Sequence, residues 1–135
     1  MALIASDVAA WLIAPRPVLA LTVAAGQDAP DLRTITLSLP ADLRLSRSLS
    51  AVSVSSAANQ AVAHKLQGRR GKLTVTLRDV ASRVRVVLGA GSVIPAGSLV
   101  TSIRQGQQAT IGLDVESTDQ SGLKTELPLA LTPGR

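Results

Sequence analysis

The sequence predicts an all-β protein, an antiparallel β-sandwich of about seven to eight strands. Beyond Pro17 it consists of short runs in which apolar and polar residues alternate, as in strands that have one buried face. Turn residues separate these runs at roughly ten-residue spacing, and no long amphipathic helix interrupts them. Two sheets packed face to face bury all the apolar faces at once, so a sandwich is favoured over the runner-up, a closed barrel.

The first four runs indicate strands and the side chains that face inward. They occupy residues 17–26, 32–40, 51–56 and 60–66. Pro40 ends the second run because proline cannot donate to a sheet. The inward-facing residues we expect are Leu19, Leu21, Val23, Ile35, Leu37, Leu39, Val52, Val54, Val62, His64 and Leu66.

The remaining runs follow at 72–78, 83–88, 109–118 and 123–132. Asp79 to Ser82 is a link short enough for the two flanking runs to form an antiparallel pair. SLVTSI, within the loop-like stretch 89–108, is expected to be a small helical turn or an edge strand. Pro128 has the opposite parity to the inward leucines around it, which indicates an edge strand or a bulge. The first and last runs are therefore the candidate sheet edges.

Residues 1–13 are an apolar segment that we expect to be a short helix, an extra strand or the remnant of a domain boundary. Residues 14–135 are expected to form a single sandwich domain. The N-terminus does not resemble a targeting segment, because no basic residue precedes its apolar part and Asp7 interrupts it. Pro15 and Pro17 then stop it short of a membrane span.

The composition limits the classes of function. Trp11 is the only aromatic residue, so stacking platforms for sugars or single-stranded nucleic acid and methyl-ammonium cages are disfavoured. Cysteine is absent, which excludes disulfides, thiolate metal sites and a cysteine nucleophile. The net charge of +5 raises general affinity for anionic partners, although the arginines are scattered along the chain.

The strongest chemical feature is the stretch QGRRGK at 67–72, which lies between two alternating runs. A phosphate-binding loop would need a helix N-terminus after its glycines. Because a predicted strand follows instead, we expect a hairpin turn in which Gly68 and Gly71 supply positive φ. Its cations either contact an acidic glycan or nucleic acid by charge or form a solvated tip. These candidate anion-binding residues are Arg69, Arg70, Lys72 and Lys65, with Arg78 nearby.

Other chemistry has less support. His64 is the only histidine and shares its parity with apolar residues, so a structural role is favoured over catalysis. Asp114, Glu116 and Asp119 are a weaker calcium candidate, because their spacing does not match a known calcium loop and acids are common on turns and strand faces. No G-x-S-x-G motif is present, and we predict neither an enzyme nor a cofactor.

The order of several phrases resembles an Ig-like all-β module found in secreted and cell-surface proteins of high-GC Gram-positive bacteria, the actinobacteria. The phrases are LSLPADLRLS, AHKLQGRRGKLTVTLRDVASRVRVVL, VIPAGSLVTS and IGLDVESTDQSGLKTELPLALT, and the likeness covers roughly residues 14 to 132. The resemblance implies an extracellular, non-catalytic Ig-like sandwich that serves as a spacer or protein-interaction unit within a longer chain.

The partners expected on this basis are another protein or the neighbouring domains of a longer chain. An acidic polysaccharide at the basic turn and self-association through an edge strand are the other partners considered. No small-molecule substrate is expected.

Overall fold

The computed structural model describes nine stretches of the chain, and for residues 3–11 and 131 it describes the backbone alone. The described residues are 3–11, 18–26, 30–41, 43–46, 50–56, 60–69, 71–89, 92–106 and 110–131. The strands are β1 (Leu3–Trp11), β2 (Val18–Ala25), β3 (Leu32–Ser38), β4 (Leu43–Leu45), β5 (Val52–Ser56), β6 (His64–Arg69), β7 (Lys72–Ala81), β8 (Arg83–Leu88), β9 (Val93–Pro95), β10 (Ile111–Asp119) and β11 (Lys124–Leu131), and the helix is α1 (Gly97–Arg104).

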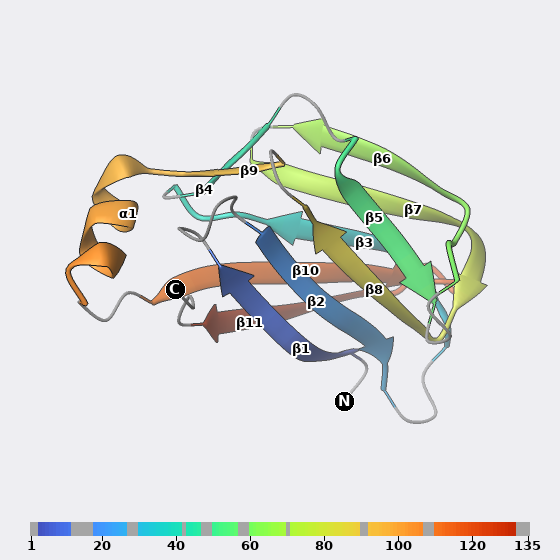
Figure 1. Ribbon diagram of the computed structural model, residues 1–135. Helices are drawn as coiled ribbons and strands as arrows, with labels where there is room; N and C mark the ends of the chain where they lie inside the picture. The colour runs from blue at the N-terminus through green and yellow to red at the C-terminus, as the bar shows by residue number, and fades with distance from the viewer. Residues whose placement is uncertain are drawn as a thin grey trace.

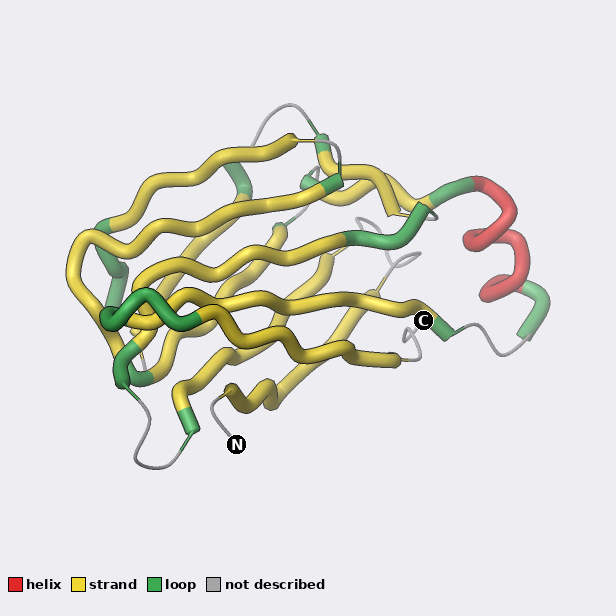
Figure 2. The backbone as a smooth tube through the Cα atoms, turned by 180° about the vertical axis from the view of Figure 1, so that it is seen from behind, coloured by secondary structure: helices red, strands yellow, loops and turns green. Residues whose placement is uncertain are grey.

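Two antiparallel sheets form the body of the molecule, which confirms the predicted β-sandwich (Figure 1). Sheet A has the strand order β1-β2-β8-β5, and sheet B has the order β11-β10-β3-β7-β6. A two-stranded ribbon, β4-β9, leads to α1 at one end. In the reverse view the long strands of sheet B lie in front (Figure 2).

The alternating runs account for the core between the sheets. The large side chains that face the core in the regular parts of the strands are Leu19, Leu21, Val23, Val54, Val84, Val86 and Leu88 in sheet A, and Ile35, Leu37, Leu73, Val75, Leu77, Ile111, Leu113 and Val115 in sheet B. Both sets lie at alternate positions, because successive side chains of a strand point to opposite faces. At the end of the sandwich, Leu99 and Ile103 of α1 pack against the same core.

The eight alternating runs all form strands, and the larger total comes from three further segments. β1 is the extra strand that was one of the alternatives for residues 1–13, and it pairs with β2. β4 and β9 are only three residues long and pair with each other, so neither shows an alternating pattern in the sequence. SLVTSI forms most of α1, which is the helical alternative of that prediction. Among the described residues, no helix is long and apolar enough to cross a membrane.

The expected pairing of runs 72–78 and 83–88 is wrong. β7 belongs to sheet B and β8 to sheet A, so the chain changes sheet at Ser82, whose carbonyl oxygen accepts a hydrogen bond of 2.8 Å from the Ala25 N–H. β7 has no free edge for β8, because β3 and β6 flank it on either side. The short link is therefore a corner between the layers and not a hairpin turn.

The sheet edges also differ in part from the prediction. The first run, β2, is not an edge, because β1 covers its outer side. Both faces of β2 are buried, and the outward positions carry the small side chains of Ala20, Thr22 and Ala24. The last run, β11, is an edge as predicted, and Pro128 lies on it with an exposed side chain.

Candidate binding surface

The stretch 67–72 forms a hairpin, as predicted, and the pairing of its strands leaves a turn of two residues. Arg69 at the end of β6 pairs with Lys72 at the start of β7, and the turn contains Gly71 with φ 77°. The Leu39 N–H donates a 2.9 Å hydrogen bond to the Gly71 carbonyl oxygen, which ties the turn to the end of β3. Gly68 does not supply a positive φ, contrary to expectation, because it lies within β6 opposite Leu73.

The register of the hairpin places its cations on the outward face of sheet B. Residues directly opposite one another in an antiparallel pair point to the same face. Lys65 pairs with Thr76, Gln67 with Thr74, and Arg69 with Lys72, while Leu73, Val75 and Leu77 point into the core. Arg78 continues the outward positions of β7. We define the cationic face as Lys65, Gln67, Arg69, Lys72, Thr74, Thr76 and Arg78.

Arg70, one of the four predicted anion-binding residues, lies outside the described residues. The other three, Lys65, Arg69 and Lys72, are exposed and share the cationic face. The two threonines and Gln67 were not predicted as site residues. The sequence does contain the information that identifies them, because the length of the hairpin turn determines which β6 residue lies opposite each β7 residue.

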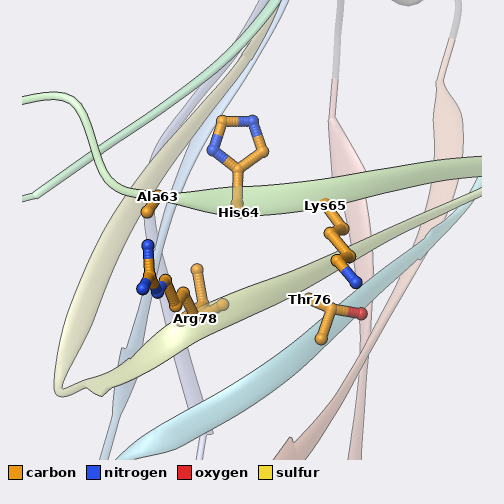
Figure 3. A pocket seen from close by; sticks show the side chains of 6 residues that line it. Ala63, His64, Lys65, Thr76 and Arg78 are labelled. Atoms are coloured by element: carbon orange, nitrogen blue, oxygen red, sulfur yellow. The ribbon is translucent and has the colours of Figure 1, made fainter.

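Two hollows adjoin this hairpin. The larger, of about 570 Å³, is lined by Ala63, His64, Lys65, Thr76, Leu77 and Arg78. The smaller, of about 280 Å³, is lined by Gln67, Arg69, Lys72 and Thr74. In the larger hollow Lys65 and Thr76 lie side by side and Arg78 extends toward Ala63, while His64 points to the other side of its strand (Figure 3). The basic side chains thus border space that a ligand could occupy.

Arg33 of β3 adds a further cation at one end of this surface. Its Nη1 donates a 3.2 Å hydrogen bond to the carbonyl oxygen of Arg78, and the side chain is exposed. Arg33 lies where the β3–β7 register shifts, between Leu32 and Thr34, so the regular alternation of β3 does not reveal its place.

His64 has a structural contact. Its Nδ1 donates to the carbonyl oxygen of Val62 at 2.5 Å, which binds the side chain to the segment that enters β6. The ring is half-buried, and the residues that line its hollow include no carboxylate. A general base of the Ser-His-Asp type needs an acid that orients its ring, and no described residue of this hollow supplies one.

The three candidate calcium ligands are divided between two faces of β10. Asp114 and Glu116 lie on the outward face, whereas Asp119 is buried at the end of the strand. The Asp119 carboxylate accepts hydrogen bonds from the Ser121 hydroxyl, from the Ser121 N–H at 2.9 Å and from the Leu123 N–H at 3.0 Å. Within the described ranges, no three His, Cys, Asp or Glu side chains form a group that could hold a metal ion.

The turn after β10 changes the acidity of Asp119. The hydrogen bond from the Ser121 hydroxyl is the largest cause, and together with bonds from the backbone N–H groups of the turn it holds the pKa of Asp119 below the ordinary 3.8, against the opposing effect of burial. Asp119 therefore stabilises the β10–β11 turn as a carboxylate.

The outward face of sheet B carries charges of opposite sign on its two sides. Asp114 and Glu116 of β10 and Glu126 of β11 form an acidic strip, which ends at the exposed Lys124 on the same face of β11. β3 lies between this strip and the cationic face. It presents the hydroxyl-bearing Thr34, Thr36 and Ser38, and the Thr36 and Thr74 hydroxyl oxygens lie 3.5 Å apart.

No family model and no curated protein matches the sequence, but solved structures match its fold. BcpA, the major pilin subunit of Bacillus cereus, is similar over 97% of this chain and 40% of its own, with a TM-score of 0.53 and 11% identity. A DUF4466 family protein from Parabacteroides merdae is similar over 98% of this chain and 44% of its own, with a TM-score of 0.52 and 11% identity. ACE19, the collagen binding subdomain of the Enterococcus faecalis surface protein ACE, has a TM-score of 0.47 and 10% identity over 100% of this chain and 97% of its own.

This chain spans less than half the length of BcpA and of the Parabacteroides protein. At these identities the likeness establishes the fold alone. The solved structures of similar fold include a bacterial pilin subunit.

Proposed function

We propose that this chain is a non-catalytic structural or adhesive module of a secreted or cell-surface protein, in which it serves as a spacer or protein-interaction unit. The observation that carries the proposal is the fold itself. Its two sheets enclose a continuous aliphatic core, and a pilin subunit shares this arrangement over 97% of the chain. The resemblance of phrase order to actinobacterial surface modules supports the same conclusion and suggests that origin.

The described polar side chains agree with a non-catalytic role. The imidazole of His64 bonds to the Val62 carbonyl oxygen in the segment that enters β6. Among the described carboxylates Asp119 is the most buried, and its Oδ1 accepts three hydrogen bonds from its own turn. Both side chains are thus committed to local structure. A catalytic acid or base must instead reach a substrate proton within hydrogen-bond distance.

The sheet edges indicate how a neighbouring domain would dock. The Asp119 N–H donates to the Leu123 carbonyl oxygen at 3.1 Å, so these two residues form a hydrogen-bonded pair of the β10–β11 ladder. In an antiparallel ladder every second pair is hydrogen-bonded, so the other hydrogen-bonded pairs follow at two-residue intervals along β10. The Asp114–Pro128 pair falls between two such pairs, so the nitrogen of Pro128 faces the unpaired outer edge of β11, the strand that β1 of sheet A also contacts. A strand added there would lack a donor and would meet the proline ring, which disfavours pairing at this edge.

The other edge of sheet B is open in the described part of the chain. The Arg78 N–H bonds to the Ala63 carbonyl oxygen, so the backbone groups of His64, Leu66 and Gly68 face away from β7. We propose this β6 edge, rather than β11, as the place where a neighbouring domain or a second copy adds a strand.

Surface labelling of intact cells tests the proposed location. The lysines at 65, 72 and 124 are exposed, so a membrane-impermeant amine reagent should label this protein before the cells are lysed. A cytoplasmic protein of the same cells is the control. Labelling that occurs only after lysis would refute the location.

Enzyme assays test the non-catalytic role. The purified protein and its His64→Ala variant should show the same background rate on generic ester substrates. A rate above background that is lost in His64→Ala would contradict the proposal.

A further inference from the structure

We infer that the cationic face binds a linear acidic glycan that lies along the β6–β7 hairpin. This inference is independent of the proposed structural role, since a spacer needs no such site. It rests on the placement of the charges, on the groups between them and on the acidic strip beyond β3.

The charges follow the direction of the strands. Arg69 and Lys72 form a pair at the turn, Lys65 lies four residues along β6, and Arg78 lies six residues along β7. At about 3.4 Å per residue, the cations extend over roughly 20 Å, and the two strands are only about 4.8 Å apart. Such a narrow row fits a linear chain better than a compact anion. Arg33 lengthens the row beside Arg78.

The groups between the cations are neutral and form hydrogen bonds. Gln67 lies between Lys65 and Arg69 on β6, and Thr74 and Thr76 lie between Lys72 and Arg78 on β7. Each of the two hollows includes at least one of these neutral residues. An acidic glycan has hydroxyl groups between its charged groups, so amide and hydroxyl side chains complement it. The exposed strands also hold these side chains at a set spacing, which a flexible loop would not do.

The acidic strip restricts the path of the ligand. Two strand spacings separate Lys72 from Asp114, which is about 10 Å and close to the screening length in physiological salt. Asp114 and Glu116 therefore repel an anion that extends across β3, and the favourable path follows the hairpin.

Other anionic partners fit this surface less well. Single-stranded nucleic acid binds through aromatic stacking, but the only aromatic residue, Trp11, lies on sheet A. A membrane surface would require apolar side chains that enter the lipid. Among the described residues, the exposed large hydrophobic side chains are Ile94 and Leu123, and neither is on the cationic face.

Retention on three immobilised probes tests the inference: heparin, hyaluronate and duplex DNA. The test variant is Lys65→Ser with Lys72→Ser. The matched control is Arg83→Ser with Arg104→Ser, which removes the same charge from exposed positions on sheet A and α1. If four cations contact the polymer, affinity for heparin or hyaluronate should fall on the order of 100-fold between 50 and 200 mM salt, as counterion release requires.

The test variant should lose about tenfold in affinity at physiological salt and should show a smaller salt dependence, because two contacts are gone. The control should change by less than about twofold. Equal losses in the two variants would show an effect of net charge and overturn the inference. Tighter binding to DNA than to either glycan, lost in the test variant, would make the face a nucleic-acid site and equally overturn it.

A second variant tests the restriction on the path of the ligand. Asp114→Asn with Glu116→Gln removes charge from the acidic strip and leaves the hairpin intact. It should raise glycan affinity by about two- to fivefold, because repulsion over one screening length is weak but present. Unchanged affinity would refute confinement of the ligand to the hairpin. Far-UV circular dichroism and thermal melts establish that each variant is folded.

Discussion

Replacing Gly71 with alanine measures the backbone cost of the hairpin turn. Gly71 has φ 77°, a conformation in which an L side chain costs about 1–2 kcal/mol. The added Cβ would lie 3.8 Å from the Leu39 carbonyl oxygen, an ordinary contact, so the whole penalty is backbone strain. With a urea m value of about 2 kcal/mol per M, the unfolding midpoint should fall by roughly 0.5–1 M.

Gly112→Ala is the matched control, because Gly112 lies in β10 of the same sheet and a Cβ there meets nothing within 4 Å. This variant should keep the wild-type midpoint or raise it, since alanine lowers the freedom of the unfolded chain. Gly71→Asn should recover part of the loss, because asparagine tolerates positive φ better than alanine. Equal midpoints for Gly71→Ala and Gly112→Ala would refute the dependence of the turn on positive φ.

Three further predictions concern the core, the β10–β11 turn and the open edge. Leu73→Ala should cost about 2–5 kcal/mol in chemical denaturation, because the side chain is fully buried, and a cost under about 1 kcal/mol would contradict the packing. The folded pKa of Asp119 lies below its unfolded value, so its carboxylate stabilises the fold above that value, and the advantage is lost as the pH falls through the folded pKa. The unfolding midpoints of wild type and Asp119→Asn should therefore converge in acid, and a gap that widened there would count against the turn. Pro128→Thr should cause concentration-dependent self-association in size-exclusion chromatography, because it adds an N–H donor to the edge of β11. Ala130→Thr is the control and should not associate, since residue 130 already has an N–H on that edge. Identical elution of the two variants would contradict the role of the proline.

The alternation of residues was sufficient to predict eight of the strands that the structure describes. In β7 the residues Leu73, Val75 and Leu77 are buried while Thr76 and Arg78 are exposed, as their order in the chain indicates. This information is local, because a strand with one face on the core must alternate. For the same reason all eight runs became strands, whereas the three-residue β4 and β9 were too short to be recognised.

Strand pairing was harder to predict because it depends on distant residues. The link between β7 and β8 has a length that suits a hairpin or a corner. The corner forms because β7 already has a strand on each side. β3 pairs with one side of β7, for example Ile35 with Val75, and β6 pairs with the other, so β8 cannot join this sheet there. Similarly, β2 is an interior strand only because β1 pairs with it, and no pattern within β2 reveals that neighbour.

The difference between local alternation and long-range pairing also changes where the candidate site lies. In the sequence, Arg69 and Arg70 draw attention to the tip of the hairpin, but a turn of two residues is too small to surround a ligand. The register places Lys65, Lys72 and Arg78 beside Arg69 on one face, where the ladder holds them at fixed spacing. A slip of one residue would turn the β6 cations toward the core and expose Leu66, and burial of unpaired charge makes that slip costly. The pattern that buries Leu73, Val75 and Leu77 therefore also maintains the row of cations, so glycan binding and the stability of sheet B depend on the same register.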